Sequence, residues 1–226
     1  MAEQHQPIEV PGAGAVSAIR ADPGRLSDTL LIYAPGAGSN IHDPFGAYLT
    51  RELLTSGVRT LRFQFPYMEA GRRGPDRNAV LERTWRAAIE SVRSENIRLI
   101  ASGRSMGGRI ASQVVAQGVA VDALVLFAYP LHPPGRPDQL RDAHLPSIQA
   151  PTLFVSGTRD AFGSTEELKA ATAKVPLASM HFLTEADHGF AVPKSTGRSR
   201  QDVWREAIRA LLTWLDSLRG KLGGLE

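Results

Sequence analysis

Short apolar runs alternate with longer amphipathic segments along most of this chain, and this alternation limits the folds that it can adopt. The short runs predict strands, and several are apolar throughout, which is typical of parallel strands covered on both faces. The longer segments carry apolar residues at helical spacing. Together they predict an α/β fold with a mostly parallel central sheet and helices on both faces. The expected strands cover residues 15–19, 29–33, 59–65, 97–101, 123–127, 152–155 and 179–183, and the expected helices cover 44–56, 77–94, 107–117, 164–174 and 199–219.

The apolar run at 97–101 leads into a pentapeptide of the form Gly-x-Ser-x-Gly, which extends from Gly103 to Gly107. A strand, a sharp turn that carries Ser105 and a following helix are the context of a nucleophile elbow. Small residues two positions to either side of the serine let the chain pass through this turn without a steric clash. In a chain with 21 glycines the pentapeptide alone is a weak signal, and an ordinary glycine-rich loop is the alternative.

A serine hydroxyl needs a general base and a carboxylate that orients the base, and the chain offers both in the order Ser, Asp, His. Asp160 follows the expected strand at 152–155, and His188 follows the one at 179–183. Active-site loops of parallel sheets lie at such strand ends. We therefore predict that Ser105, Asp160 and His188 are catalytic. Asp187 is a competing carboxylate, but it is an awkward partner for its own chain neighbour, and a turn or capping role is the alternative for Asp160.

The chemistry also requires backbone N–H groups that stabilise an oxyanion. One is expected from the residue after the nucleophile, which is Met106. The second is expected from the loop after the strand at 29–33, where glycines allow N–H groups to turn inward. Ala37 is our first choice for this second donor, and Gly38 is the next.

Charge and cysteine content exclude several classes of function. The formal net charge is +3 at pH 7, and the arginines are scattered apart from a local cluster at Arg72, Arg73 and Arg77. This pattern is a poor match to a nucleic-acid-binding surface, so no nucleic-acid partner is expected. The chain has no cysteine, which excludes disulfides, thiolate chemistry and zinc–cysteine sites.

No cofactor and no metal are expected. The loop that contains Gly36 and Gly38 has Ile41 where a dinucleotide-binding motif would require its third glycine. His42 and Asp43 lack a matching set of metal ligands elsewhere in the chain. Capping of the helix that begins at residue 44 is the better account of Asp43.

A single domain is expected over residues 1–226, with frayed ends at about 1–12 and about 220–226. The N-terminus lacks the pattern of a signal peptide. The longest apolar run, 123–129, is far shorter than the roughly 18 residues of a membrane span. We therefore expect a cytoplasmic protein with no membrane partner, either a monomer or a homodimer.

Six sequence blocks stand out along the chain. They are Phe63-Gln64-Phe65-Pro66-Tyr67, Gly71-Arg72-Arg73-Gly74-Pro75-Asp76, Gly103-Arg104-Ser105-Met106-Gly107-Gly108-Arg109, Tyr129-Pro130-Leu131-His132-Pro133-Pro134-Gly135, Gly157-Thr158-Arg159-Asp160 and Asp187-His188. Together these blocks resemble a known group of small α/β-hydrolases within the dienelactone-hydrolase-like superfamily, a group also related to the hydrolase-like subunit of the NSL histone-acetyltransferase complex of animals. The resemblance covers roughly residues 30–188 and implies an α/β-hydrolase fold with Ser105, Asp160 and His188 at the triad positions. Dienelactone hydrolases themselves use cysteine as the nucleophile, and this chain has none.

The segment 128–150 is rich in proline and too short for a cap domain, which predicts a shallow, open site for small substrates. We expect its walls to include Tyr67, Arg72, Arg73, Tyr129 and His132. The two arginines would attract an anionic acyl group, although solvated surface arginines are an equal alternative and a structural role for His132 is favoured over a catalytic one. The leading hypothesis is a serine hydrolase of carboxylesterase type that acts on a small-molecule ester or thioester. The alternative is a weakly active or inactive protein that serves as an interaction module.

Overall fold

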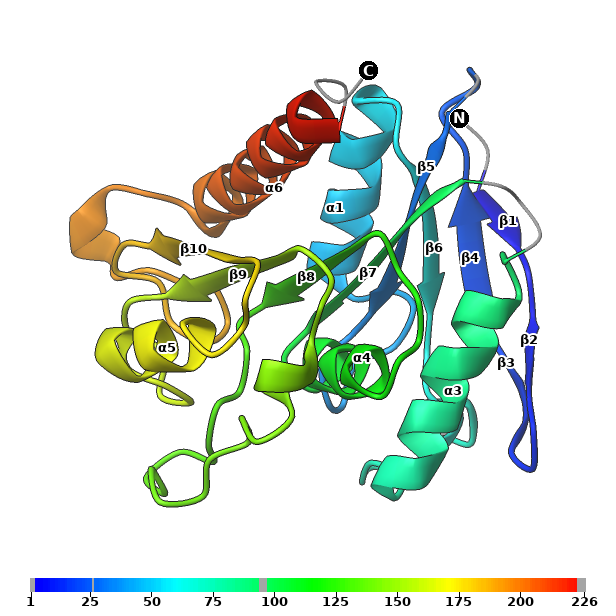
Figure 1. Cartoon of the computed structure of the whole chain (residues 1–226), viewed down its shortest axis with the longest axis horizontal. Helices are drawn as coiled ribbons and strands as arrows, with labels where there is room; N and C mark the ends of the chain where they lie inside the picture. The colour runs from blue at the N-terminus through cyan, green and yellow to red at the C-terminus, as the bar shows by residue number, and fades with distance from the viewer. Residues whose placement is uncertain (1–2, 26, 94–96, 223–226) are drawn as a thin grey trace.

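An eight-stranded sheet runs through the middle of the protein (Figure 1) in a computed structural model that describes residues 3–25, 27–93 and 97–222. The strand order is β1-β4-β6-β5-β7-β8-β9-β10. The first two neighbouring pairs in this order, β1 with β4 and β4 with β6, are antiparallel, and all the other pairs are parallel. The expected mostly parallel sheet is therefore confirmed. The strands are β1 (Glu3–His5), β4 (Ala18–Ala21), β5 (Thr29–Ala34), β6 (Arg59–Phe63), β7 (Arg98–Arg104), β8 (Ala123–Phe127), β9 (Thr152–Gly157) and β10 (Ala178–Leu183).

Helices cover both faces of the sheet (Figure 1). On one face lie α1 (Pro44–Thr55) and α6 (Arg200–Leu222), and on the other lie α3 (Asn78–Glu90), α4 (Met106–Ala116) and α5 (Thr165–Thr172). All five expected helices are present, with ends that differ by a few residues. The short elements α2 (Pro66–Glu69), η1 (Leu145–Ser147) and η2 (Lys194–Thr196) were not expected.

The start of α1 follows from its sequence. Asp43 precedes the helix, and its Oδ2 accepts a hydrogen bond of 2.9 Å from the N–H of Gly46. Proline occupies the first helical position, where its missing N–H costs nothing. The expected capping role of Asp43 is confirmed.

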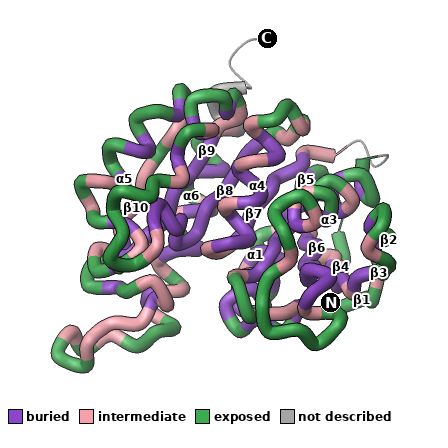
Figure 2. Tube along the Cα trace, turned by 90° about the horizontal axis from the view of Figure 1, so that it is seen from below, coloured by how far each residue is buried: buried purple, intermediate pink, exposed green. Residues whose placement is uncertain are grey.

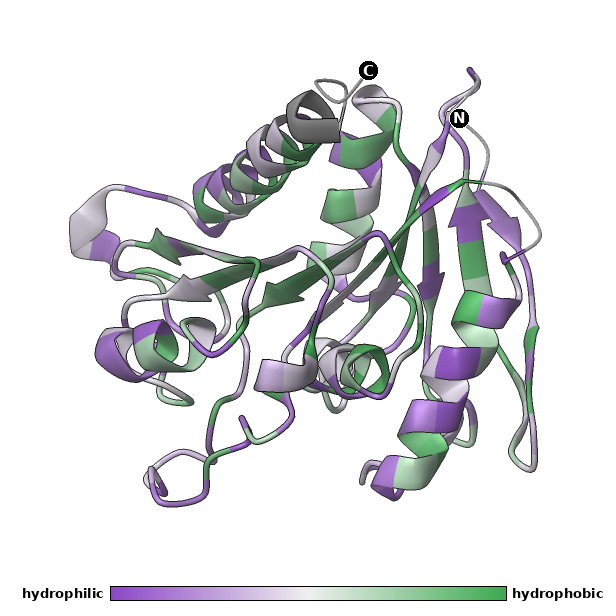
Figure 3. Ribbon diagram, viewed as in Figure 1, coloured by the Kyte–Doolittle hydropathy of each residue, from purple (hydrophilic) through white to green (hydrophobic). Residues whose placement is uncertain are grey.

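Alternate residues of β5 supply both apolar layers. Leu30 and Ile32 pack into the layer under α3, α4 and α5, whereas Leu31 and Tyr33 pack into the layer under α1 and α6. This division follows from the two-residue period of a strand. Because both faces are covered, the strands at the centre of the sheet are buried (Figure 2) and their residues are predominantly apolar (Figure 3).

The N-terminal segment differs from its expectation. Residues 3–12 are not frayed, because β1 pairs with β4, and β2 (Ile8–Val10) forms a two-stranded sheet with β3 (Gly14–Val16). The side chains of Ile8 and Val10 are each only 2% exposed. The expected single strand at 15–19 is interrupted at Ser17, whose N–H and hydroxyl both bond to the carboxylate of Glu69.

The C-terminal helix extends beyond its expected end at residue 219. The helix α6 continues through Leu222, so residues 220–222 are not a frayed tail. Residues 223–226 of that expected tail lie outside the described residues.

Loops that follow β5, β7, β9 and β10 gather at the carboxyl edge of the parallel strands, where sites of such sheets form. The chain between β8 and β9 contains η1 as its single helical turn, and its first half protrudes from the body of the molecule (Figure 1).

Candidate active site

Ser105 lies on a sharp turn between β7 and α4. Its φ of 50° and ψ of −119° place it in a backbone region that L-residues with a side chain rarely adopt. A Cβ on Gly103 would lie 2.5 Å from the carbonyl carbon of Gly107, and a Cβ on Gly107 would collide with the carbonyl oxygen of Ala34. The small residues around the serine are thus required by the close approach of α4 to β5 and β7.

The structure brings Ser105, His188 and Asp160 into one hydrogen-bonded chain. The Oγ of Ser105 lies 2.9 Å from Nε2 of His188, and Nδ1 of His188 lies 2.8 Å from Oδ2 of Asp160. With a carboxylate as acceptor, Nδ1 carries the proton and Nε2 is free to accept the serine proton. The side chain of Asp160 is 0% exposed, whereas that of His188 is 23% exposed. The acid is therefore shielded, and the base faces the solvent side of the site.

The loop that carries His188 is held from several directions. The guanidinium of Arg104 donates to the carbonyl oxygen of His188 at 3.2 Å. The ring of Phe162 stacks on the imidazole with ring centroids 4.0 Å apart. The carboxylate of Asp187 accepts from the N–H of Ala191 at 2.8 Å, so it stabilises its own loop. Asp160, rather than Asp187, is the carboxylate that contacts the histidine.

Two backbone N–H groups remain available beside the serine. Met106 and Ala37 both border the cavity, and within the described part of the chain neither N–H has a hydrogen-bond partner. The N–H of Gly38 instead donates to the hydroxyl of Tyr67 at 2.9 Å. This contact anchors the loop and favours Ala37 over Gly38, whose oxyanion role stays an untested prediction.

A cavity of about 450 Å³ opens in front of the serine. Apart from the histidine of the triad, the ionisable side chains around it are three arginines, Arg104, Arg109 and Arg141, and one carboxylate, Asp43. The residues around it are Gly36, Ala37, Ser39, Asp43, Pro75, Arg104, Ser105, Met106, Arg109, Pro130, Arg141, Phe162 and His188.

Three of the five expected wall residues are buried anchors that do not border this cavity. Tyr67 holds the loop after β5, as described above, and it is 0% exposed. The hydroxyl of Tyr129 donates to the carbonyl oxygen of Arg141 at 2.6 Å, and the N–H of His132 donates to the carbonyl oxygen of Phe162 at 3.0 Å. These residues contact neighbours that do border the cavity, and direct substrate contact by them stays an untested prediction.

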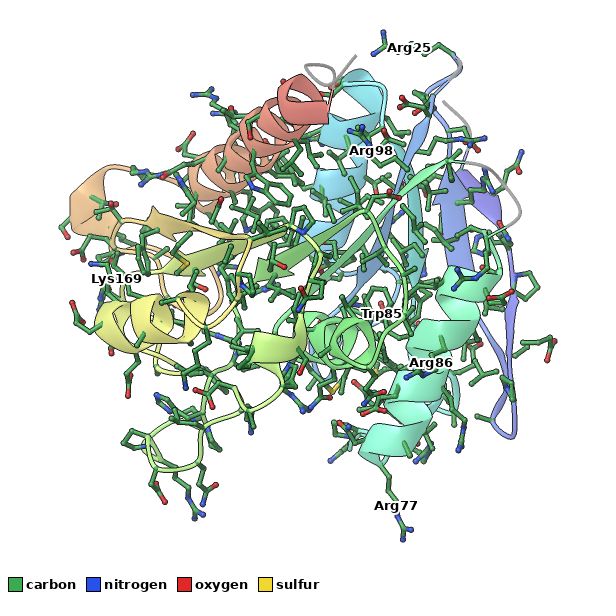
Figure 4. All side chains as sticks on the ribbon, viewed as in Figure 1. Arg25, Arg77, Trp85, Arg86, Arg98 and Lys169 are labelled. Carbon is green, nitrogen blue, oxygen red and sulfur yellow. The ribbon has the colours of Figure 1, made fainter. Side chains whose placement is uncertain are left out.

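The other two, Arg72 and Arg73, are exposed and are not among the residues around the cavity. Arg72 forms an ion pair of 2.5 Å with Asp76. Arg77, the third member of the expected cluster, extends away from the start of α3 into solvent (Figure 4). The solvated-surface alternative is the one that the structure supports for this cluster.

Sequence reasoning missed the residues that form the charged walls. Arg109 lies in the first turn of α4, which starts directly after Ser105, so its position next to the motif was a usable signal. Arg141 lies in the irregular segment after β8, and no local pattern connects it with the serine. Phe162 follows Asp160 in the turn after β9, but nothing in the sequence indicates that its ring faces the histidine.

Among the described residues, no helix combines the length and apolar character that crossing a membrane requires. In the same part of the chain, no three His, Asp or Glu side chains gather in an arrangement that could hold a metal ion.

Comparison with known proteins supports the fold expected from the sequence. The family described as an alpha/beta hydrolase domain matches residues 27–216. An alpha-beta serine hydrolase homologue from Coxiella burnetii is 20% identical, with 93% of this chain and 98% of that chain covered and a TM-score of 0.75. A dienelactone hydrolase from Anabaena variabilis is 20% identical, with coverages of 92% and 95% and a TM-score of 0.73.

A serine hydrolase without a lid from Xanthomonas campestris is 16% identical, with 94% of each chain covered and a TM-score of 0.73. Identities this low establish a shared fold and leave the reaction of this chain to be argued from its own residues.

Proposed function

Because the chain belongs to the alpha/beta hydrolase family, we propose that it is a serine hydrolase that cleaves small esters or thioesters. The observation that carries this proposal is the continuous hydrogen-bonded chain from Ser105 through His188 to Asp160, with the serine on a strained turn. A strained backbone at a polar, partly exposed residue is typical of a functional position. Carboxylesterase-type chemistry is the simplest use of these groups.

The proposed reaction proceeds in two halves. Nε2 of His188 takes the proton of Ser105 as Oγ attacks the carbonyl carbon, and the N–H groups of Ala37 and Met106 stabilise the oxyanion. The C–O or C–S bond then breaks, and the leaving alcohol or thiol receives the proton from His188. Water, deprotonated by the same imidazole, attacks the acyl-enzyme and releases the acid. Asp160 keeps the imidazole in the required tautomer throughout.

The shape of the site supports small substrates. The chain between β8 and β9 contributes a rim and no cap domain, and the cavity of about 450 Å³ lies open to solvent. The similar protein from Xanthomonas campestris is described as lacking a lid. We infer that acyl groups of a few carbons fit this site better than long lipid chains.

The test is hydrolysis of p-nitrophenyl acetate and labelling by a fluorophosphonate probe. Ser105→Ala is expected to lower kcat by at least about a thousandfold and to abolish labelling, because no other group replaces the nucleophile. Ser112→Ala is the matched control. Ser112 is in the helix that follows Ser105 and lies 2.8 Å from a histidine, His144, but it is buried and donates to the carbonyl oxygen of Arg109. Unchanged hydrolysis in Ser105→Ala would contradict the proposal.

The alternative is an interaction module without catalysis, which rests on the resemblance to the NSL-complex subunit. The complete set of Ser105, His188 and Asp160 at hydrogen-bonding distances favours the enzyme. Absence of labelling and turnover in the folded wild-type protein would favour the interaction module.

A further inference from the structure

Two of the arginines at the cavity lack an anionic partner. No carboxylate of the described residues lies within ion-pair distance of the guanidinium of Arg109 or Arg141. The side chain of Arg141 donates one hydrogen bond, of 3.4 Å, to the carbonyl oxygen of Pro130. The guanidinium of Arg109 makes no hydrogen bond to any described residue. Both residues are only partly exposed.

The carboxylates near these two arginines have other partners. Asp43 accepts from the hydroxyl of Tyr33 at 2.6 Å and lies 4.0 Å from Arg104. Asp142, next to Arg141 in the chain, forms an ion pair of 2.6 Å with Lys174. Two cationic groups thus border the site without neutralisation.

Burial and the charge of Arg141 lower the pKa of Arg109, while Tyr129 and Glu82 act in the opposite direction. The guanidinium stays protonated at neutral pH all the same. A half-buried cation that is repelled by a second cation is stabilised by an anion placed between them, and a guanidinium fork matches the two oxygens of a carboxylate.

The two arginines reach the cavity from different elements. Arg109 lies in the first turn of α4, which begins directly after Ser105, and both residues border the same cavity. A helical side chain leans toward the N-terminus of its helix, which here is the end that carries the serine. The backbone of Arg141 is fixed on both sides, because its N–H donates to Leu131 at 2.8 Å and its carbonyl accepts from Tyr129 at 2.6 Å.

We propose that Arg109 and Arg141 bind a carboxylate on the acyl part of the substrate, so that the preferred substrates are half-esters of short dicarboxylic acids. The inference rests on the proposed function, because the carboxylate is placed relative to an ester carbonyl held at Ser105. The reaction is the ester hydrolysis already described, in which the acid product is a dicarboxylate and the alcohol leaves unchanged.

The test compares two esters of equal chain length, mono-p-nitrophenyl adipate and p-nitrophenyl hexanoate. The wild type is expected to have a higher kcat/KM for the anionic ester, mainly through a lower KM. Arg109→Gln and Arg141→Gln are each expected to reduce the ratio of the two kcat/KM values by about tenfold, the usual effect of losing a charge-assisted hydrogen bond. Arg73→Gln is the matched control, since this arginine is exposed outside the cavity, and the ratio is expected to stay the same.

A second pair, 4-acetoxybenzoate and its ethyl ester, moves the carboxylate to the leaving group. A preference for 4-acetoxybenzoate in place of the adipate ester would overturn the assignment to the acyl part. Equal kcat/KM values within both pairs, with turnover that depends on Ser105, would overturn the anion site and leave the hydrolase proposal intact.

Calorimetric titration of Ser105→Ala with adipate separates binding from catalysis. Adipate binding that is lost in the double variant Ser105→Ala/Arg109→Gln supports the anion site even if no ester is cleaved. No binding at millimolar adipate by a folded Ser105→Ala protein would count against the site.

Discussion

At the scale of single residues, Tyr67 anchors the loop that carries the proposed oxyanion donor Ala37. Its hydroxyl accepts the N–H of Gly38, whose φ of 74° lies in the left-handed region. Tyr67→Phe removes this contact without changing the buried volume of the ring. We expect kcat on p-nitrophenyl acetate to fall about fivefold with little change in KM, because one hydrogen bond contributes about 1 kcal/mol.

Tyr48→Phe is the control for this prediction, since the hydroxyl of this buried tyrosine makes no hydrogen bond within the described residues. The measurement is kcat of the wild type, Tyr67→Phe and Tyr48→Phe by steady-state kinetics, with circular dichroism as a check of folding. A kcat equal to that of the wild type in Tyr67→Phe would show that the loop holds its shape without the tyrosine.

Asp160 and Arg141 differ in how well their positions in the site could be predicted from the sequence. Asp160 follows a recognisable strand, and parallel topology fixes where strand ends meet, so its place next to His188 could be predicted. Arg141 reaches the cavity through a proline-rich segment without regular structure, and its position depends on contacts with Tyr129 and Leu131. Such contacts are distributed through the fold and leave no local pattern.

At the scale of elements, the turn at Ser105 is encoded by a local sequence pattern, whereas the N-terminal strands depend on distant partners. The strand β7, the turn at Ser105 and α4 are encoded locally by an apolar run, glycines and an amphipathic helix. The strands β1 and β2 have three residues each and depend on pairing with β4 and β3. Strands this short carry too little periodicity to be recognised before their partners are known.

The contact between η1 and α4 gives a pH-dependent prediction. Burial and the neighbouring Arg109 lower the pKa of His144 from 6.5 to about 4, against an opposite effect of Asp142. The imidazole is thus neutral in the folded protein at pH values where the unfolded chain already binds a proton. As the pH falls from about 6.5 to about 4, protonation favours the unfolded state, and stability is lost.

His144→Gln keeps a polar group near Ser112 and removes this titration. We expect the urea midpoint of the wild type to fall more steeply than that of His144→Gln between pH 6.5 and pH 4, measured by circular dichroism. Parallel pH profiles of the two proteins would mean that the histidine is accessible to protons in the folded state.

At the scale of the whole molecule, the two apolar layers share one sheet. Alternate residues of the same strand, such as Leu30 and Leu31, belong to opposite layers, so neither layer can be lost while the other stays intact. The N-terminal strands join this structure, because Ile8 and Val10 are buried in the layer that contains Trp85. We therefore propose that residues 3–222 unfold as one unit.

The corresponding experiment is thermal unfolding followed by tryptophan fluorescence and by far-ultraviolet circular dichroism. Both signals are expected to change in a single coincident transition. Ile8→Ala removes a side chain that is 2% exposed and is expected to lower the free energy of unfolding by about 2–5 kcal/mol, shifting both signals together. Glu9→Ala, at an exposed position in the same strand, is the control and is expected to change it by less than about 0.5 kcal/mol. A separate early transition in Ile8→Ala would instead identify the N-terminal strands as an independent unit attached to a core that folds without them.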